Sequence, residues 1–116
     1  MSVFVQNMSE EIRYKILKIL SENPDISQRE LAEHVGVSLG KTNYCLQALK
    51  EKGLVKARNF KNNPDKRRYF YVLTPKGIEE KATVTARFLK RKMAEYETLK
   101  TEIEELKREV APRDGK

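Results

Sequence analysis

The sequence predicts a mostly α-helical chain with one small β-hairpin. Three short amphipathic segments, each beginning at a capping residue, precede Gly53. Two runs rich in Val, Phe and Tyr then flank a segment of turn-forming residues. From Pro75 onward, Gly77 alone weakens the helical pattern until Pro112. Together these observations indicate three helices, a hairpin and a long last helix.

The first helix is expected to begin after Ser9, whose side chain suits an N-cap position. Glu10 and Glu11 would follow in its first turn, where carboxylates interact favourably with the helix dipole. Residues 23–25, which include Pro24, should end it. Its apolar residues recur at helical spacing: Ile12, Ile16, Leu17, Ile19 and Leu20.

Residues 27–55 carry the pattern of a helix-turn-helix. Ser27 and Glu30 form a capping box for the second helix, and Gly36 suits the left-handed position that ends it. Ser38 caps the third helix, which Gly53 ends. The second helix should bury Leu31, Ala32 and Val35, and the third Thr42, Cys45, Leu46 and Leu49.

The opposite face of the third helix is expected to read DNA in the major groove. Lysine donates to guanine, while asparagine and glutamine bond adenine bidentately. A glycine in this helix would let its backbone approach the DNA closely. The expected recognition residues are Ser38, Leu39, Gly40, Lys41, Asn43, Tyr44 and Gln47. The alternative is a solvated face on a domain that binds protein instead.

The hairpin is expected to pair residues 54–60 with residues 68–73 around a tip at 61–67. Basic side chains near a hairpin tip suit phosphates, and an arginine there can enter a narrow minor groove. The expected contacts are Arg58, Lys61, Lys66, Arg67 and Arg68. The alternative is a charged hairpin that only increases solubility. With this hairpin as its wing, the domain is expected to be a winged helix-turn-helix.

The net charge of +7 is unevenly distributed along the 116 residues. Residues 38–76 contain ten basic and two acidic residues, a net charge of +8. Residues 1–37 carry −2 and residues 77–116 carry +1. This basic segment includes the third helix and the hairpin, the two elements expected to contact DNA. The coincidence favours a polyanionic partner, and double-stranded DNA is the expected one.

The last helix carries a heptad repeat typical of a coiled coil. Tyr96, Ile103 and Val110 occupy a positions, with Leu99 and Leu106 at d, a pattern that favours a parallel dimer. In a parallel pair, the glutamates at g face lysines at e of the partner: Glu95 with Lys100, and Glu102 with Lys107. The expected dimerisation residues are Phe88, Leu89, Met93, Tyr96, Leu99, Ile103, Leu106 and Val110.

Upstream of residue 95 this seam is poorer, with Lys92 at a d position. Phe88, Leu89 and Met93 are expected to pack on the globular domain or on its partner. The alternative for the whole helix is an amphipathic segment folded back on its own domain. Because residues 95–110 are too short to pair stably alone, dimerisation needs help from the upstream part.

Four segments follow from these patterns. Residues 1–8 are expected to be a flexible N-terminal segment, and residues 9–76 the winged helix-turn-helix DNA-binding domain. Residues 77–111 would form the long C-terminal dimerisation helix, and residues 112–116 a disordered tail.

The stretch VGVSLGKTNYCLQALKEKGLVKARNF, followed by YFYVLTPKGIEEKA, resembles the MarR family of bacterial regulators. More narrowly, SLGKTNYCL is similar to the exopolysaccharide (EPS)-associated transcriptional regulators. The resemblance runs from the first helix into the last. It implies a homodimer on a pseudo-palindromic operator, with polysaccharide-synthesis genes as targets. Larger MarR proteins dimerise through helices at both ends. Because little precedes the first helix here, the C-terminal helix is expected to supply most of the interface.

Other chemistry finds little support in the sequence. Residues 36–42 are one residue short of a phosphate-binding P-loop and lie between two helices rather than after a strand. The single histidine, His34, and the single cysteine, Cys45, form no metal-ligand spacing. We therefore expect no enzyme activity, cofactor or metal. We also expect no membrane partner and a cytoplasmic location, because no signal peptide and no sufficiently long apolar run is present.

The sequence thus predicts a homodimeric, sequence-specific DNA-binding transcriptional regulator, by default a repressor that occludes a promoter. The alternative is a winged-helix module that binds protein, with a coiled-coil arm and no specific DNA binding. The sequence identifies no small-molecule effector.

Overall fold

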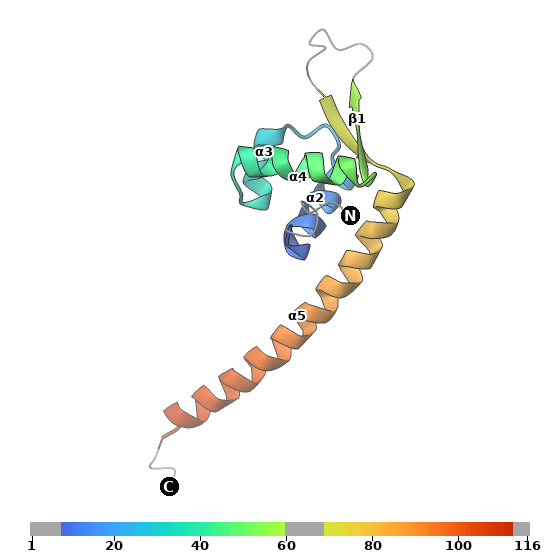
Figure 1. The fold of residues 1–116 in the computed structure, drawn as a ribbon. Helices are drawn as coiled ribbons and strands as arrows, with labels where there is room; N and C mark the ends of the chain where they lie inside the picture. The colour runs from blue at the N-terminus through green and yellow to red at the C-terminus, as the bar shows by residue number, and fades with distance from the viewer. Residues whose placement is uncertain (1–7, 60–68, 113–116) are drawn as a thin grey trace.

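The computed structural model describes residues 8–59 and 69–112. These residues form helices α2 (Glu10–Glu22), α3 (Gln28–Val35) and α4 (Leu39–Glu51), strands β1 (Val55–Asn59) and β2 (Tyr69–Leu73), and helix α5 (Pro75–Val110). Figure 1 shows α2, α3 and α4 gathered beside the hairpin, with α5 leaving this group as a long rod. The predicted winged helix-turn-helix with a long last helix is confirmed. The predicted flexible segment and tail fall largely on residues 1–7 and 113–116, outside the described residues.

The helix starts follow the predicted caps. The Ser9 side chain accepts a hydrogen bond from the Ile12 amide at 3.1 Å. Ser27 and Glu30 form the reciprocal capping box, with bonds of 3.1 and 3.3 Å. Gly36 ends α3 with φ at +84°, in the left-handed region that only glycine enters without strain. These local signals therefore fix the turn that separates α3 from α4.

The core lies where the three short helices meet the hairpin. Ile16, Leu17, Leu31, Leu46 and Leu49 are almost completely buried. The predicted inner face of α4 is confirmed, and Ala48 joins it. The one buried polar side chain among the described residues is Thr42, whose hydroxyl donates to the Ser38 carbonyl at 3.0 Å. This bond satisfies a group that would otherwise cost free energy when buried.

Strands β1 and β2 pair antiparallel, with Val55 opposite Leu73 and Asn59 opposite Tyr69. Val55 and Tyr71 point into the core and attach the hairpin to the helices. Both strands lie within the predicted ranges 54–60 and 68–73, and β2 ends at the predicted residue, Leu73. The predicted tip at 61–67 lies outside the described residues.

Helix α5 begins on the domain and leaves it. The Thr74 hydroxyl caps the helix by accepting from the Gly77 amide at 3.0 Å, and Pro75 opens the first turn. Gly77 lies so close to the Leu54 carbonyl that a Cβ would overlap with it. Val84 is fully buried, so the core includes a residue from the segment 77–111 that the sequence interpretation gave to the dimerisation helix.

Beyond Phe88 every described residue of α5 is exposed. The helix has 36 residues, which corresponds to a length of about 54 Å at the α-helical rise. The molecule accordingly measures 75 × 29 × 23 Å. The hairpin and the far end of α5 lie at opposite ends of this long axis (Figure 1). We call residues 89–110 of α5 the arm.

Candidate nucleic-acid interface

Helix α4 presents one face to solvent while the other is buried. Each predicted recognition residue lies on the exposed side: Ser38, Leu39, Gly40, Lys41, Asn43, Tyr44 and Gln47. Leu39 and Tyr44 are 41% and 42% exposed, so two large side chains on this face lie outside the core. The Lys41 ammonium lies 6.0 Å from the centre of the Tyr44 ring, within cation–π range. This face therefore combines donors, amides and an aromatic ring without an acidic residue.

Ser38 has a structural role. Its hydroxyl accepts from the Lys41 amide at 3.0 Å and its carbonyl accepts from the Thr42 amide at 2.9 Å. The hydroxyl thereby satisfies one of the free amides at the start of α4. It fixes the direction in which the first turn of α4, with Gly40 and Lys41, faces solvent.

Gly40 is not required by the fold. Its φ is not positive, since Gly36 and Gly53 are the described glycines with that conformation. A Cβ at Gly40 would meet nothing closer than the Ser38 hydroxyl at 4.0 Å. A glycine lowers helix stability relative to alanine. The packing of the described residues does not explain this cost, and the open space leaves room for the close approach expected from the sequence.

Gln47 contacts the wing. Its Nε2 donates to the Tyr71 hydroxyl at 3.4 Å, and Tyr71 itself is 8% exposed. The second N–H and the Oε1 of Gln47 stay available, which are the two groups that bond adenine bidentately. Sequence reasoning missed Tyr71 because it lies 24 residues from Gln47 along the chain. The sequence predicted only that residues 68–73 form a strand and named no role for Tyr71.

The described part of the wing adds Arg58, which is exposed on β1 opposite Phe70. Lys56 is exposed on the same strand. The other predicted wing residues, Lys61, Lys66, Arg67 and Arg68, lie outside the described residues. The base of the wing is thus basic and solvent-facing, next to the helix that carries the recognition residues.

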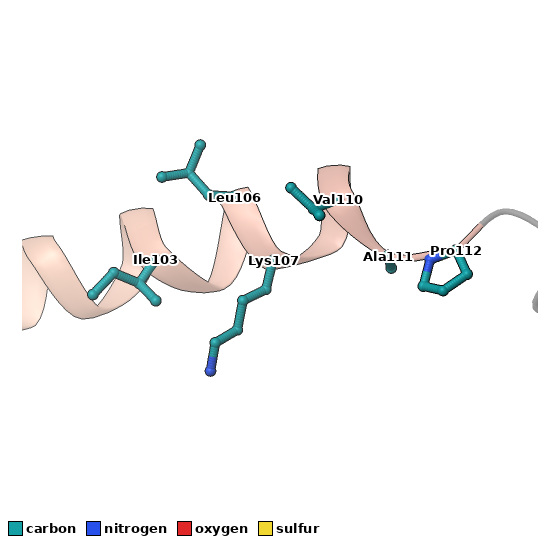
Figure 2. A pocket seen from close by; sticks show the side chains of 6 residues that line it. All are labelled: Ile103, Leu106, Lys107, Val110, Ala111 and Pro112. Atoms are coloured by element: carbon teal, nitrogen blue, oxygen red, sulfur yellow. The ribbon is translucent and has the colours of Figure 1, made fainter.

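The arm carries an exposed apolar stripe that no other described residue covers beyond Phe88. The predicted dimerisation residues on it are between 42% and 81% exposed: Leu89, Met93, Tyr96, Leu99, Ile103, Leu106 and Val110. At its end, Ile103, Leu106 and Val110 border an open apolar groove of about 470 Å³ (Figure 2). Phe88 differs from the others, because its ring packs against Tyr14 of α2 with centroids 4.8 Å apart.

Three other features bear on chemistry: the single cysteine, groups that could hold a metal ion, and the segment 36–42. Cys45 is completely buried, and this burial raises the pKa of its thiol, which disfavours the reactive thiolate. Residues 8–59 and 69–112 contain no group of three or more His, Cys, Asp or Glu side chains that could hold a metal ion. Gly36, Ser38 and Lys41 belong to helix ends rather than to a phosphate-binding loop after a strand. Within the same residues, no helix is both long and apolar enough to cross a membrane.

Comparison with known proteins agrees with this architecture. Residues 9–56 match the family model described as winged helix-turn-helix DNA-binding. No curated protein matches the chain. The zinc-responsive MarR family member ZitR of Lactococcus lactis is 25% identical, with a TM-score of 0.58 over 76% of this chain and 58% of that chain.

Two further solved structures have the same fold. The MarR of Staphylococcus aureus, in complex with salicylate and kanamycin, is 23% identical with a TM-score of 0.54, covering 85% of this chain and 73% of its own. The PcaV transcriptional regulator of Streptomyces coelicolor is 19% identical with a TM-score of 0.60, covering 85% and 79%. This chain is therefore a winged helix-turn-helix protein with the fold of the MarR-family transcription regulators.

Proposed function

We propose that the protein is a sequence-specific transcriptional regulator that binds double-stranded DNA as a homodimer. Each subunit would insert the N-terminal part of α4 into a major groove and lay its basic wing along the adjacent backbone. The observation that carries this proposal is the exposed face of α4, where Lys41, Asn43 and Gln47 project from a helix whose other face is buried.

We call the winged helix-turn-helix domain, residues 9–76, the reading head. Its charge supports DNA over a protein partner. Residues 39–50 of α4 contain no acidic side chain, and α4 has none in its first turn. The segment 38–76 carries a net charge of +8. Contacts from lysine and arginine to phosphates release counterions, so the affinity should fall steeply with salt. A module that recognises a neutral protein surface has no need for this charge.

The arm supports a second copy of the chain as the partner. Its apolar stripe repeats every three and four residues from Tyr96 to Val110, the spacing that two supercoiled helices bury between them. Exposing such a stripe to water is unfavourable. Lys100 and Lys107 flank the stripe on one side and Glu95 and Glu102 on the other, which makes the surface complementary to itself.

The shape of the molecule favours a parallel pair. The arm leaves the domain on the side away from the hairpin (Figure 1). Parallel pairing would place both winged domains at one end of the coiled coil, where both could reach one duplex. Antiparallel pairing would place them at opposite ends and would set glutamate against glutamate across the seam.

Regulation would follow from occupancy of the operator. A dimer that covers a promoter excludes the polymerase, so repression is the default mechanism we propose. The resemblance of SLGKTNYCL to exopolysaccharide-associated regulators suggests polysaccharide-synthesis genes as targets. A two-fold dimer predicts an inverted repeat with half-sites about 10 base pairs apart, centre to centre.

The proposal is tested by separating base reading from phosphate binding. Asn43→Ala should relax the base preference at one position per half-site, costing about 1–3 kcal/mol on the preferred duplex and little on others. Arg58→Ala should weaken binding to all duplexes alike and reduce the slope of log affinity against log salt by about 1. Binding is measured by fluorescence anisotropy over a salt series.

Thr83→Ala is the matched control, since it removes an exposed, neutral polar group from α5 on the domain itself. It should leave both the base preference and the salt slope unchanged. If Asn43→Ala and Arg58→Ala both bind every duplex as the wild type does, α4 and the wing do not contact DNA. A salt-independent interaction with a protein would then be the better account.

A further inference from the structure

Helix α2 contacts α5 through side chains of both charges, partly before the arm and partly at its start. Arg13 of α2 pairs with Glu80 of α5, and Glu10 of α2 pairs with Arg91 of α5, each at 3.5 Å. The rings of Tyr14 and Phe88 meet between these ion pairs. We call these six residues the α2–α5 junction. It joins the reading head, to which α2 belongs, with the helix that leads into the dimer seam.

The junction fixes the direction of α5 as well as its position. On α5 the two ion pairs are 11 residues apart, about 16 Å along the helix axis. On α2 their partners are only three residues apart, less than one turn. The two pairs therefore attach α2 to well separated points of α5, which favours one direction of α5 relative to α2.

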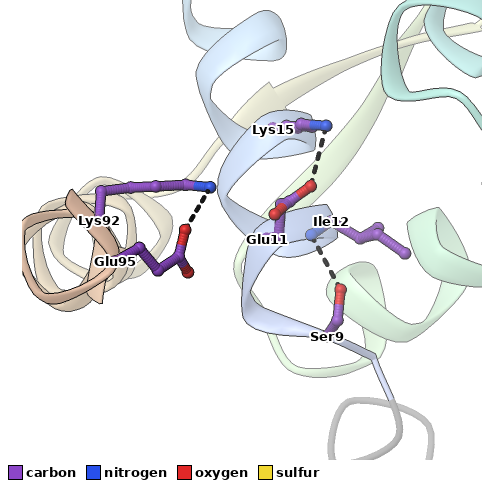
Figure 3. Close-up of polar contacts among 6 residues, drawn as sticks. All are labelled: Ser9, Glu11, Ile12, Lys15, Lys92 and Glu95. Carbon is purple, nitrogen blue, oxygen red and sulfur yellow. Dashed lines mark hydrogen bonds and ion pairs between the residues drawn. The ribbon is translucent and has the colours of Figure 1, made fainter. Parts of the chain in front are cut away.

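Further side chains of opposite charge lie beside these ion pairs on the two helices. The first turn of α2 holds Glu10 and Glu11, while the facing part of α5 holds Arg91 and Lys92. The pKa of the Glu11 carboxyl is lowered, first by its hydrogen bond to Lys15 and the charge of Lys15, then by the charges of Lys92 and Arg91. Figure 3 looks along α5 beside α2, with Lys92 reaching toward α2 while pairing with Glu95 at 3.1 Å.

The junction is not arranged for maximal stability. The Oε1 atom of Glu10 and the Nε atom of Arg13 are buried without a hydrogen-bond partner. Arg91 is 44% exposed, and an ion pair this exposed to water contributes little to stability. Apolar side chains of similar size would hold two helices together at lower cost. The value of these charges would therefore lie in orienting α5 rather than in the free energy of folding.

We propose that the α2–α5 junction sets the distance between the two half-sites that the dimer reads, with Glu10 and Arg91 as positioning residues. This inference rests on the proposed function, because it needs two reading heads joined through their arms. A rotation of about 7° across the 29 Å width of the molecule moves its far side by about 3.4 Å, the rise of one base pair. One base pair also turns a half-site by about 34–36° around the duplex axis, because one helical turn holds about 10–10.5 base pairs. A loosened junction would let the two domains follow both changes, so the preference for one spacing should weaken.

The test measures the affinity of the full-length protein for duplexes whose half-site spacing is lengthened or shortened by one base pair from the best one. The wild type should prefer the best spacing by about tenfold. Arg91→Glu and Glu10→Arg should each reduce this preference to about twofold, because repulsion replaces the attraction at the junction. The double variant, with the charges exchanged, should restore the preference. The arms should stay dimeric in sedimentation, because Glu10 and Arg91 are not among the apolar residues expected to form the seam.

Lys90→Glu is the matched control: it makes the same change of charge one residue away, at an exposed lysine that pairs with no acidic side chain among the described residues. It should keep the wild-type spacing preference. Arg91→Gln removes the attraction without adding repulsion, and it should change the preference in the same direction if Arg91→Glu does not fold.

The test distinguishes failure of the positioning role from failure of the proposed function. If the single variants bind DNA and keep the wild-type spacing preference, or if the charge exchange fails to restore it, the junction is not the positioning device. In that case the proposed function still stands. If the wild type binds no duplex at any spacing, the proposed function fails, and the positioning role fails with it.

Discussion

At the scale of single residues, the two helical glycines Gly40 and Gly77 make opposite predictions. Gly40 has open space where a Cβ would be, whereas a Cβ at Gly77 would overlap with the Leu54 carbonyl. Gly40→Ala should therefore leave the free energy of unfolding unchanged or raise it by up to about 1 kcal/mol. If the backbone of α4 approaches DNA at this point, the same variant should lose about tenfold in affinity for its operator.

Gly77→Ala is the contrasting variant. It should unfold more easily, because α5 would have to move away from Leu54 to admit a methyl group, at a cost of about 1–3 kcal/mol. Chemical denaturation measures the stability of both variants and anisotropy measures DNA binding. A Gly40→Ala protein that is stable and binds its operator with unchanged affinity would rule out close approach at Gly40.

Residue roles could be predicted only where the signal is local. The caps at Ser9, Ser27 and Ser38 involve partners three residues away, so the sequence contains both members of each pair. The bond between Gln47 and Tyr71 joins residues 24 apart and depends on how β2 packs across α4. No periodicity in the sequence reports such a contact. The recognition and wing residues themselves stay a prediction until DNA binding is measured.

At the scale of elements, helix periodicity predicted α2, α3 and α4 and their buried faces, because one side of each helix must pack on the core. It did not predict how much of α5 belongs to the domain. Gly77 and Val84 are buried in the domain, but one glycine and one valine do not break the helical pattern from which the long last helix was predicted. The ion pairs of the α2–α5 junction were also unpredicted, since exposed charges carry no pairing information over 60 residues or more.

The arm gives the prediction that belongs to this scale. Tyr96→Cys, at the first a position of the seam, should form a disulfide with the same residue of a second chain in a parallel coiled coil. An antiparallel seam, in which a positions face d positions, would instead bring residue 96 near residue 106. The native Cys45 is fully buried and should not compete for the reaction. Mild oxidation followed by non-reducing electrophoresis measures the cross-link.

Thr98→Cys is the control, because residue 98 lies on the side of the helix away from the seam. It should give little cross-linking. If Tyr96→Cys and Thr98→Cys cross-link equally poorly while Tyr96→Cys mixed with Leu106→Cys cross-links well, the arms pair antiparallel. Absence of any dimer in sedimentation would favour an arm that folds back or binds another protein.

At the scale of the whole molecule, the reading head and the arm have separate tasks. Contacts at one end of the 75 Å axis would determine which bases are read, and contacts at the other would determine how many heads are present. The junction between them would determine how far apart the heads lie. The fold of the reading head was predictable, as was the existence of the arm. The resemblance to the exopolysaccharide-associated branch stays a prediction from the sequence.

The most direct test of this account is selection from a pool of random duplexes by the full-length protein, followed by sequencing of the bound fraction. The account predicts enrichment of an inverted repeat whose half-sites lie about 10 base pairs apart, centre to centre, with two chains bound to each duplex. Asn43→Ala should select a repeat with one relaxed position in each half-site. Enrichment of no sequence, or of a single unrepeated site bound by one chain, would contradict it.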